Sequence, residues 1–211
     1  VSLKRLATDF GSSDVEISGR LIRYMAFLDE NAGPDGLPRL TGSVKSGMLN
    51  FDEWIDWEAE ADTTLYEYPI YLPEMTASVS MEVDTMLMTG VSITDIRGTA
   101  NTSPDRVTVE NASARMFDGS MAGSMVWNVP RPERTNLTFK GRLDTVEASA
   151  FFKEFAIMGE DSDFHEYVSG SFSAQTDYYT EIVVYLSPVI PSSESEGSFG
   201  MTKMRLKGHP A

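Results

Sequence analysis

The residues best suited to hold a metal ion lie in one acidic segment around His165. Glu160, Asp161, Asp163 and Glu166 surround this histidine, and carboxylate oxygens are the ligands that calcium prefers. The segment lacks the spacing and the glycine pivot of an EF-hand loop. We therefore expect a solvated acidic loop and no metal centre, with a weak calcium site as the alternative.

Residues for other chemistry are scarce. The chain has no cysteine and two histidines, His165 and His209, which excludes disulfides, zinc-thiolate sites and cysteine nucleophiles. It contains no Gly-x-Ser-x-Gly motif and no phosphate-binding glycine loop that leads into a helix. Carboxylates are plentiful, but no pair stands out as the acid and base of a glycoside hydrolase. We expect a non-catalytic protein without a cofactor and keep a carbohydrate hydrolase as an alternative.

Composition narrows the range of partners. The 211 residues carry a net charge of −15 and include six lysines. No basic stripe is present to neutralise the phosphates of a nucleic acid or to dock on anionic lipid headgroups. The acidic balance suits a soluble surface, and a salt-loving source is the alternative interpretation. No apolar run approaches the roughly 18 residues of a membrane helix.

Short strands dominate the sequence. Apolar and polar residues alternate in 77–84, 121–129, 137–143 and 168–174, which predicts strands that bury one face and expose the other. The segment 182–186 is more uniformly apolar. The pattern predicts a mainly β fold.

Turn residues separate several of these runs. Asp118-Gly119 and Ser103-Pro104-Asp105 each predict a hairpin. Within 106–116 the apolar positions change parity after Val109. One extra residue near Glu110-Asn111 would return the later apolar side chains to the strand face of Val109. This predicts a β-bulge there.

Helices are expected at two places, and loops at two others. Residues 146–156 bring Phe151 and Phe152 onto neighbouring helix faces behind an Asp144 or Thr145 cap. A second short helix over 51–61 would turn Trp54, Ile55 and Trp57 inward and Asp52, Glu53, Asp56, Glu58 and Glu60 toward water. Composition predicts loops at residues 31–38 and 188–197. The second of these could be mobile.

Glycines recur inside the apolar runs. Seven of the sixteen glycines have an apolar residue two positions away on both sides, where chance predicts about three. Gly119 is assigned to its turn, and the others are Gly19, Gly42, Gly98, Gly123, Gly141 and Gly170. A glycine on the apolar face of a strand removes bulk and lets the sheet bend. The result is either a curved sheet over an ordinary core or a trough whose apolar wall can hold a ligand.

The order of segments over residues 37–208 resembles the C-terminal region of the AsmA family. Residues 72–84 contain a proline followed by an alternating strand, and residues 88–98 are a Gly-containing strand. Residues 106–123 then contain one strand that ends before a turn and another that begins after it. The family has glycine where this chain has Asp118. The later matching segments are 139–148, 168–172 and 195–208.

The resemblance implies a curved antiparallel sheet, trough-like or partly open and barrel-like, with one or two short helices. It implies residues 1–36 as leading strands and loop, and 37–208 as an AsmA-like region of the same continuous domain. AsmA-like proteins are anchored in the bacterial inner membrane by a helix and extend into the periplasm, where they affect outer-membrane assembly. Because the chain begins at Val1 within patterned sequence, we expect it to be a periplasmic segment of such a longer protein.

The expected ligand is the acyl part of a phospholipid, since long relatives form apolar troughs thought to conduct phospholipids. The expected trough lining is Val79, Met81, Val83, Met121, Met125, Trp127, Leu137, Phe139, Leu143, Val168 and Phe172. Methionines suit an adaptable apolar wall. The alternative is a structural or protein-binding β module with a sealed core, whose edges pair with other envelope proteins or with neighbouring segments of the same chain.

Overall fold

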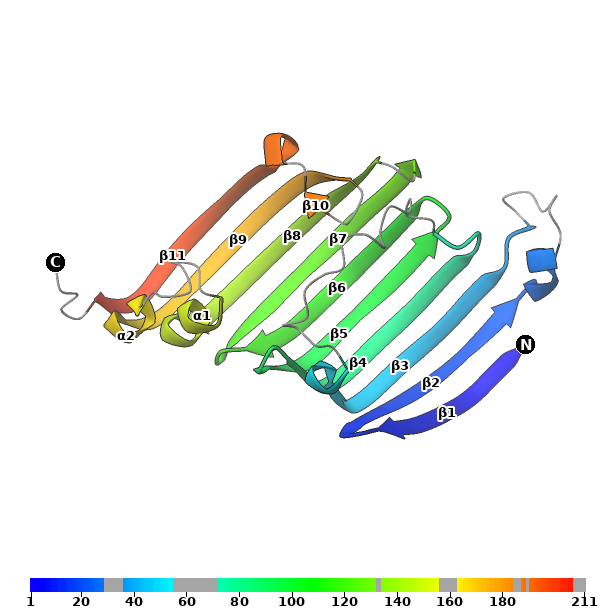
Figure 1. Ribbon diagram of the computed structural model, residues 1–211, viewed down its shortest axis with the longest axis horizontal. Helices are drawn as coiled ribbons and strands as arrows, with labels where there is room; N and C mark the ends of the chain where they lie inside the picture. The colour runs from blue at the N-terminus through cyan, green and yellow to red at the C-terminus, as the bar shows by residue number, and fades with distance from the viewer. Residues whose placement is uncertain are drawn as a thin grey trace.

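The computed structural model describes residues 1–28, 36–54, 72–131, 134–155, 163–183, 187–188 and 190–206, which form one open sheet of 11 strands (Figure 1). The strands are β1 (Ser2–Phe10), β2 (Ser13–Ile22), β3 (Arg39–Asn50), β4 (Thr76–Met88), β5 (Val91–Ser103), β6 (Arg106–Met116), β7 (Gly119–Arg131), β8 (Arg134–Glu147), β9 (Val168–Val183), β10 (Ser187–Pro188) and β11 (Glu194–Leu206). The mainly β, curved and unclosed fold predicted from the sequence is confirmed.

Strand order follows the chain from β1 to β10, and β11 pairs with β9. Every pair is antiparallel except β3 and β4, which run parallel. A parallel pair needs a crossover connection rather than a hairpin, and the long segment between Asn50 and Thr76 provides it. The sheet also continues across the expected boundary at residue 36, because β2 pairs with β3.

The helices are short. They are α1 (Ala148–Phe155), α2 (Phe164–Tyr167) and the 3₁₀ turns η1 (Tyr24–Leu28), η3 (Phe51–Glu53) and η6 (Ile190–Ser192). The predicted helix near 146–156 is present, but its cap was assigned wrongly, since β8 continues to Glu147. The Glu147 carboxylate accepts hydrogen bonds from the backbone N–H groups of Ser149 (3.1 Å) and Ala150 (2.6 Å), which satisfies donors that a helix start leaves free.

The helix predicted over 51–61 begins as η3, and residues 55–61 lie outside the described part of the chain. Trp54 was expected to point inward and is instead 45% exposed. The Asp52 carboxylate accepts from the N–H groups of Thr89 (2.6 Å) and Gly90 (2.9 Å). Glu53 accepts from the N–H of Ser12 at 3.0 Å. These acidic groups therefore tie the β4–β5 and β1–β2 turns to η3 rather than only facing water.

Both predicted hairpins are present, but the turn of one lies one residue earlier than predicted. Ser103 pairs with Arg106 around the Pro104 turn, as predicted. In the β6–β7 hairpin, Met116 pairs with Gly119, so the turn residues are Phe117 and Asp118, both in the left-handed region. The assignment of Gly119 to the turn was wrong. It opens β7, where an added Cβ would lie 2.7 Å from the Asp144 carbonyl oxygen.

The bulge predicted near Asn111 is confirmed: the β6–β7 register shifts between Val109 and Ala112, and Asn111 has φ of 52°. Three further register shifts contain a non-glycine residue with positive φ. These residues are Asp95 in β5, Thr145 in β8 and Lys203 in β11. A bulge of this kind adds one residue to a strand and increases its bend.

The described residues within 188–197 have more regular structure than their loop composition predicted. Ser187 and Pro188 pair with the end of β9, and Ile190–Ser192 form η6. Glu194–Gly197 then belong to β11 and pair with Thr176–Tyr179. A polar stretch can form this strand because it lies at a sheet edge, where the side chains need no core.

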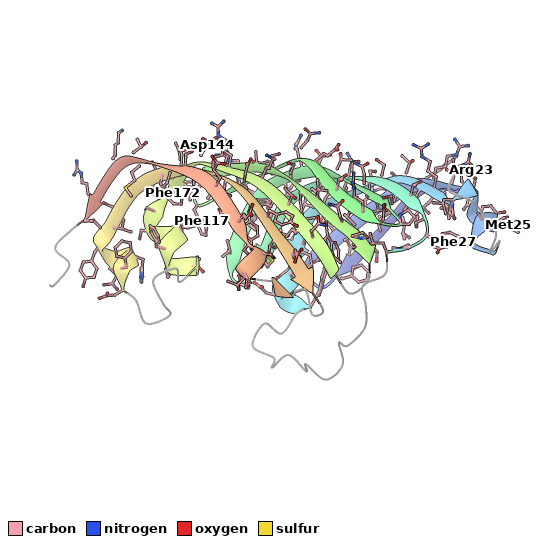
Figure 2. All side chains as sticks on the ribbon, turned by 90° about the horizontal axis from the view of Figure 1, so that it is seen from above. Arg23, Met25, Phe27, Phe117, Asp144 and Phe172 are labelled. Carbon is pink, nitrogen blue, oxygen red and sulfur yellow. The ribbon has the colours of Figure 1, made fainter. Side chains whose placement is uncertain are left out.

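The sheet is arched. Figure 2 shows it from the side, with α1 and α2 in the hollow; Phe117 and Phe172 point into the hollow and Asp144 points away from it. We call these two surfaces the concave face and the convex face. Leu143 packs with Phe172 and so lies on the concave face, and its cross-strand partners Met121 and Ala174 share that face.

Two facing glycines allow β7 and β8 to approach closely on the concave face. Gly123 pairs with Gly141. A Cβ at Gly123 would lie 2.5 Å from the carbonyl oxygen of Lys140, and one at Gly141 would lie 2.5 Å from the ring of Phe139. The Phe139 ring occupies the space that these glycines leave, which is how an aromatic side chain shields a glycine in a sheet.

Gly123→Ala is expected to lower the free energy of unfolding by about 1–3 kcal/mol, because the added methyl group meets a backbone carbonyl that cannot rotate away. Gly200→Ala on β11 is the matched control, since the nearest atom to its Cβ is 3.9 Å away, and it should change stability by less than about 0.5 kcal/mol. Urea unfolding of both variants measures the difference. Equal stabilities would contradict the close approach of β7 and β8.

Candidate functional site

The concave face forms one apolar surface across the sheet. Ile17 pairs with Val44, and Val44 with Met81. Farther along, Met125 pairs with Phe139. Direct cross-strand neighbours project from the same face, so the apolar residues of successive strands form continuous rows. We call this surface the trough floor: Leu6, Ile17, Leu40, Val44, Val79, Met81, Ala100, Val109, Met121, Met125, Trp127, Leu137, Phe139 and Leu143.

All eleven residues predicted to line a trough lie on the concave face, but they differ in exposure. Met81 is 43% exposed and Phe139 37%. Val83, Val168 and Phe172 are buried, so they support the surface rather than line it. The other six are partly buried: Val79, Met121, Met125, Trp127, Leu137 and Leu143.

The sequence interpretation missed the parts of this surface at both sheet edges. Leu6 and Ile17 extend it over β1 and β2, and Phe199 and Met201 extend it over β11. Phe199 is 52% and Met201 61% exposed. The glycine signature at Gly19 already pointed to the first of these regions, since it places Ile17 on an apolar strand face.

One end of the concave face is closed by a cluster of phenylalanines. Val146, Val168 and Phe172 of the strands form a buried core with Ala148, the first residue of α1. Ring centroids lie 4.9 Å apart for Phe151–Phe172 and 5.3 Å apart for Phe152–Phe164, within the range of favourable aromatic pairs. The helices therefore cover the concave face beside β8 and β9, while the trough floor stays accessible elsewhere.

The convex face is polar, and several of its charges are paired across strands. Glu82 on β4 contacts Lys45 (3.1 Å) on β3 and Arg97 (3.3 Å) on β5. Lys140 contacts Asp177. The two cations hold the pKa of the Glu82 carboxyl below its usual value, Lys45 first by hydrogen bonding and then by charge. A shallow depression of about 310 Å³ lies over this ion-pair group, but its one carboxylate already pairs with both cations, so we place the candidate site on the concave face.

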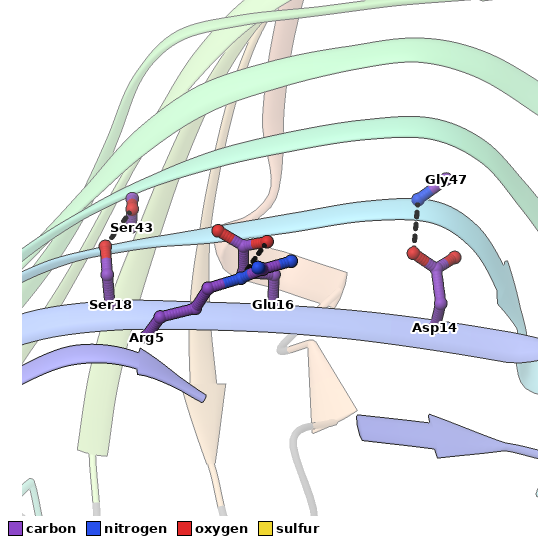
Figure 3. Close-up of polar contacts among 6 residues, drawn as sticks. All are labelled: Arg5, Asp14, Glu16, Ser18, Ser43 and Gly47. Carbon is purple, nitrogen blue, oxygen red and sulfur yellow. Dashed lines mark hydrogen bonds and ion pairs between the residues drawn. The ribbon is translucent and has the colours of Figure 1, made fainter. Parts of the chain in front are cut away.

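Similar polar contacts join β1, β2 and β3 on the convex face (Figure 3). Arg5 pairs with Glu16 at 2.9 Å, and the Ser18 and Ser43 hydroxyls lie 2.8 Å apart. Asp14 accepts hydrogen bonds from the backbone N–H groups of Gly47 (3.1 Å) and Met48 (2.7 Å). These backbone donors, Gly47 first, lower the pKa of the Asp14 carboxyl.

The acidic segment around His165 is only partly described. His165 lies on α2, and Asp163 accepts a hydrogen bond from the Tyr167 hydroxyl at 3.2 Å. Residues 160–162 and His209 lie outside the described part of the chain. Among the described residues, no three His, Cys, Asp or Glu side chains come together to hold a metal ion.

No protein-family model and no curated protein matches this chain. None of the helices in the described ranges is long and apolar enough to cross a membrane. The geometry of the concave face is therefore the main guide to function.

Asp14→Asn is expected to destabilise the protein at pH 6, because an amide cannot accept both backbone hydrogen bonds as a carboxylate does. A carboxyl whose folded pKa is lowered contributes stability above its unfolded pKa, about 4, and loses it as pH falls through the folded pKa. The difference between native protein and variant should therefore shrink below pH 4. Urea unfolding from pH 6 to pH 2 measures it, with the exposed Asp84→Asn as control. A pH-independent difference would contradict this role of Asp14.

Proposed function

We propose that the concave face binds the acyl chains of phospholipids. The observation that carries the proposal is the accessibility of large apolar side chains on this face, from Leu6 (50% exposed) through Met81 (43%) to Met201 (61%). Contiguous exposed apolar surface usually marks a binding site for an apolar partner. The trough floor extends across many strands, which gives it the length that an extended acyl chain requires.

Hydrocarbon suits this surface better than a polar ligand. In the middle of strands β2 to β9, the cross-strand register places no Asp, Glu, Lys or Arg on the concave face. A charged ligand would lose its hydration there without meeting an opposite charge. Met81, Met121 and Met125 have flexible, polarizable side chains that adapt to different chain conformations. Binding would therefore depend on the hydrocarbon and tolerate different headgroups.

The order of strands, turns and glycines that resembles the AsmA family supports a wider proposal. On this proposal the chain is a periplasmic segment of an AsmA-like envelope protein that is anchored to the inner membrane outside this segment. The apolar trough would support phospholipid transport or outer-membrane assembly without catalysis. The arched sheet and its glycine-bent strands are consistent with this role.

Binding can be tested with a phospholipid that carries a fluorophore on one acyl chain. Met81→Glu is expected to weaken binding at least about tenfold, because a carboxylate on the trough floor must be desolvated by the hydrocarbon. The matched control is Ser80→Glu, which places the same charge at the next residue, on the convex face. It should bind as the native protein does.

Native mass spectrometry of the protein purified from cells provides a second readout, with co-purified phospholipid expected on the native protein and Ser80→Glu. Circular dichroism must show that both variants are folded. Equal binding by the two variants, or a native protein consistently free of lipid and of probe, would contradict the proposed function.

The envelope location can be tested separately in the source cell. The protein is expected to fractionate with the periplasm or the inner membrane, and its loss should make the outer membrane more permeable to detergents and large antibiotics. A cytosolic location with unchanged permeability would contradict the envelope role while leaving acyl-chain binding open to the test above.

A structural or protein-binding module remains the second candidate function, favoured by one observation. The edge strands β1 and β11 are exposed along most of their length. An exposed edge presents backbone donors and acceptors to another strand. This candidate differs from the first in needing the edges rather than the concave face.

A further inference from the structure

The edge strand β11 has one free side. Its residues pair with β9 from Glu194 to Leu206, and among the described residues no strand pairs with its other side. Natural sheets usually protect such an edge with a short strand, a mid-strand charge or a cover. The part of β11 from Glu194 to Thr202 is long and regular, and its bulge lies only near the end, at Lys203.

The side chains of β11 change in character from one side of Gly200 to the other. Phe199 and Met201 flank it on the concave face and are exposed. Glu194 and Glu196 precede this apolar centre, and Lys203 and Arg205 follow it. The strand is therefore acidic in its first third, apolar in its centre and basic in its last third.

An antiparallel copy of the same strand complements this order. If Gly200 faces the partner's Gly200, then Phe199 faces the partner's Met201, and Met201 faces the partner's Phe199. Because the bulge at Lys203 adds one residue to the strand, Glu196 then faces the partner's Arg205 and Glu194 lies diagonal to it on the same face, and the reverse holds at the other end. Opposite charges and apolar pairs at facing positions both stabilise strand pairing. A two-fold interface uses the same patch on both copies.

We propose that β11 pairs with β11 of a second copy of this chain, antiparallel and about a two-fold axis at Gly200. The axis runs through the sheet, so both concave faces lie on the same side and the trough floor continues from one copy into the other. The proposal concerns the sheet edge and does not depend on what the concave face binds.

The other edge is less suited to this pairing. β1 has nine residues, and a register shift between Leu3 and Leu6 interrupts it. Lys4 and Arg5 lie in that irregular part, which leaves a short regular stretch. A bulge protects an edge from pairing; the one in β1 leaves only residues 6–10 in regular register, whereas the one in β11 leaves residues 194–202. We therefore assign the interface to β11.

Charge reversal tests the proposal without reference to the ligand. The variant E194K/E196K makes β11 basic throughout, and K203E/R205E makes it acidic throughout. Each alone should dimerise at least about tenfold more weakly than the native protein in sedimentation equilibrium, because like charges would face each other at both ends. An equimolar mixture should form the mixed dimer. The control K4E/R5E, on β1, should dimerise like the native protein.

A cysteine scan locates the axis, and the absence of native cysteine makes every disulfide informative. Gly200→Cys should form a disulfide-linked dimer under mild oxidation, because facing residues of antiparallel strands have Cα atoms about 4.5–5.5 Å apart. Ser198→Cys and Thr202→Cys should not, since each lies about four strand positions, or roughly 13 Å, from its own copy.

The outcomes divide clearly. Mixed-dimer rescue together with cross-linking centred on Gly200 supports the proposal. A native protein that stays monomeric at high concentration, dimerisation that K4E/R5E abolishes, or cross-linking that does not depend on position between 198 and 202 would overturn it.

Discussion

The structure depends on one constraint: each strand must keep its apolar side chains on the same face along an arched sheet. Side chains alternate with period two, so one inserted residue would turn the rest of a strand over. Asn111 and Thr145 show how the chain meets this requirement, since each occupies a bulge in the left-handed region. The bulge at Asn111 keeps Val109 and Ala112 on the concave face. The bend and the uniform face therefore have a common origin.

A single layer of strands has to find its stability without a second sheet. Backbone ladders and paired charges such as Lys45–Glu82 join neighbouring strands, but exposed ion pairs contribute little. Dense packing is concentrated around Val146 and Phe172, where α1 and α2 supply the missing layer. Elsewhere much of the concave face is only partly buried, with exceptions such as Val83 and Ala114, so the region that could bind a ligand is also the least self-sufficient part of the fold.

Much of the fold could be predicted where sequence patterns are local. Alternation identified the strands from 77 to 143, and the parity change at Val109 located a bulge. Non-local contacts could not be read in this way: Asp52 and Glu53 were assigned to solvent because their turn partners are distant in sequence. Composition predicted a loop at Glu194–Gly197 because an edge strand needs no apolar side chains there, although the family resemblance matched a closing strand from residue 195 onward. Alternation also identified the residues of the concave face. It did not predict that Val83 is buried, because that burial depends on contacts that periodicity does not encode.

The two proposals concern different consequences of the same open sheet. A closed barrel would remove both the accessible floor and the free edges; this sheet keeps both. Apolar side chains reach the last strand, as Phe199 and Met201 show, whereas a sheet that ended at β11 in solution would gain from polar residues there. Pairing through β11 would cover this edge and lengthen the apolar surface at once. The length of hydrocarbon that the trough can accommodate would then depend on the assembly as well as on the single chain.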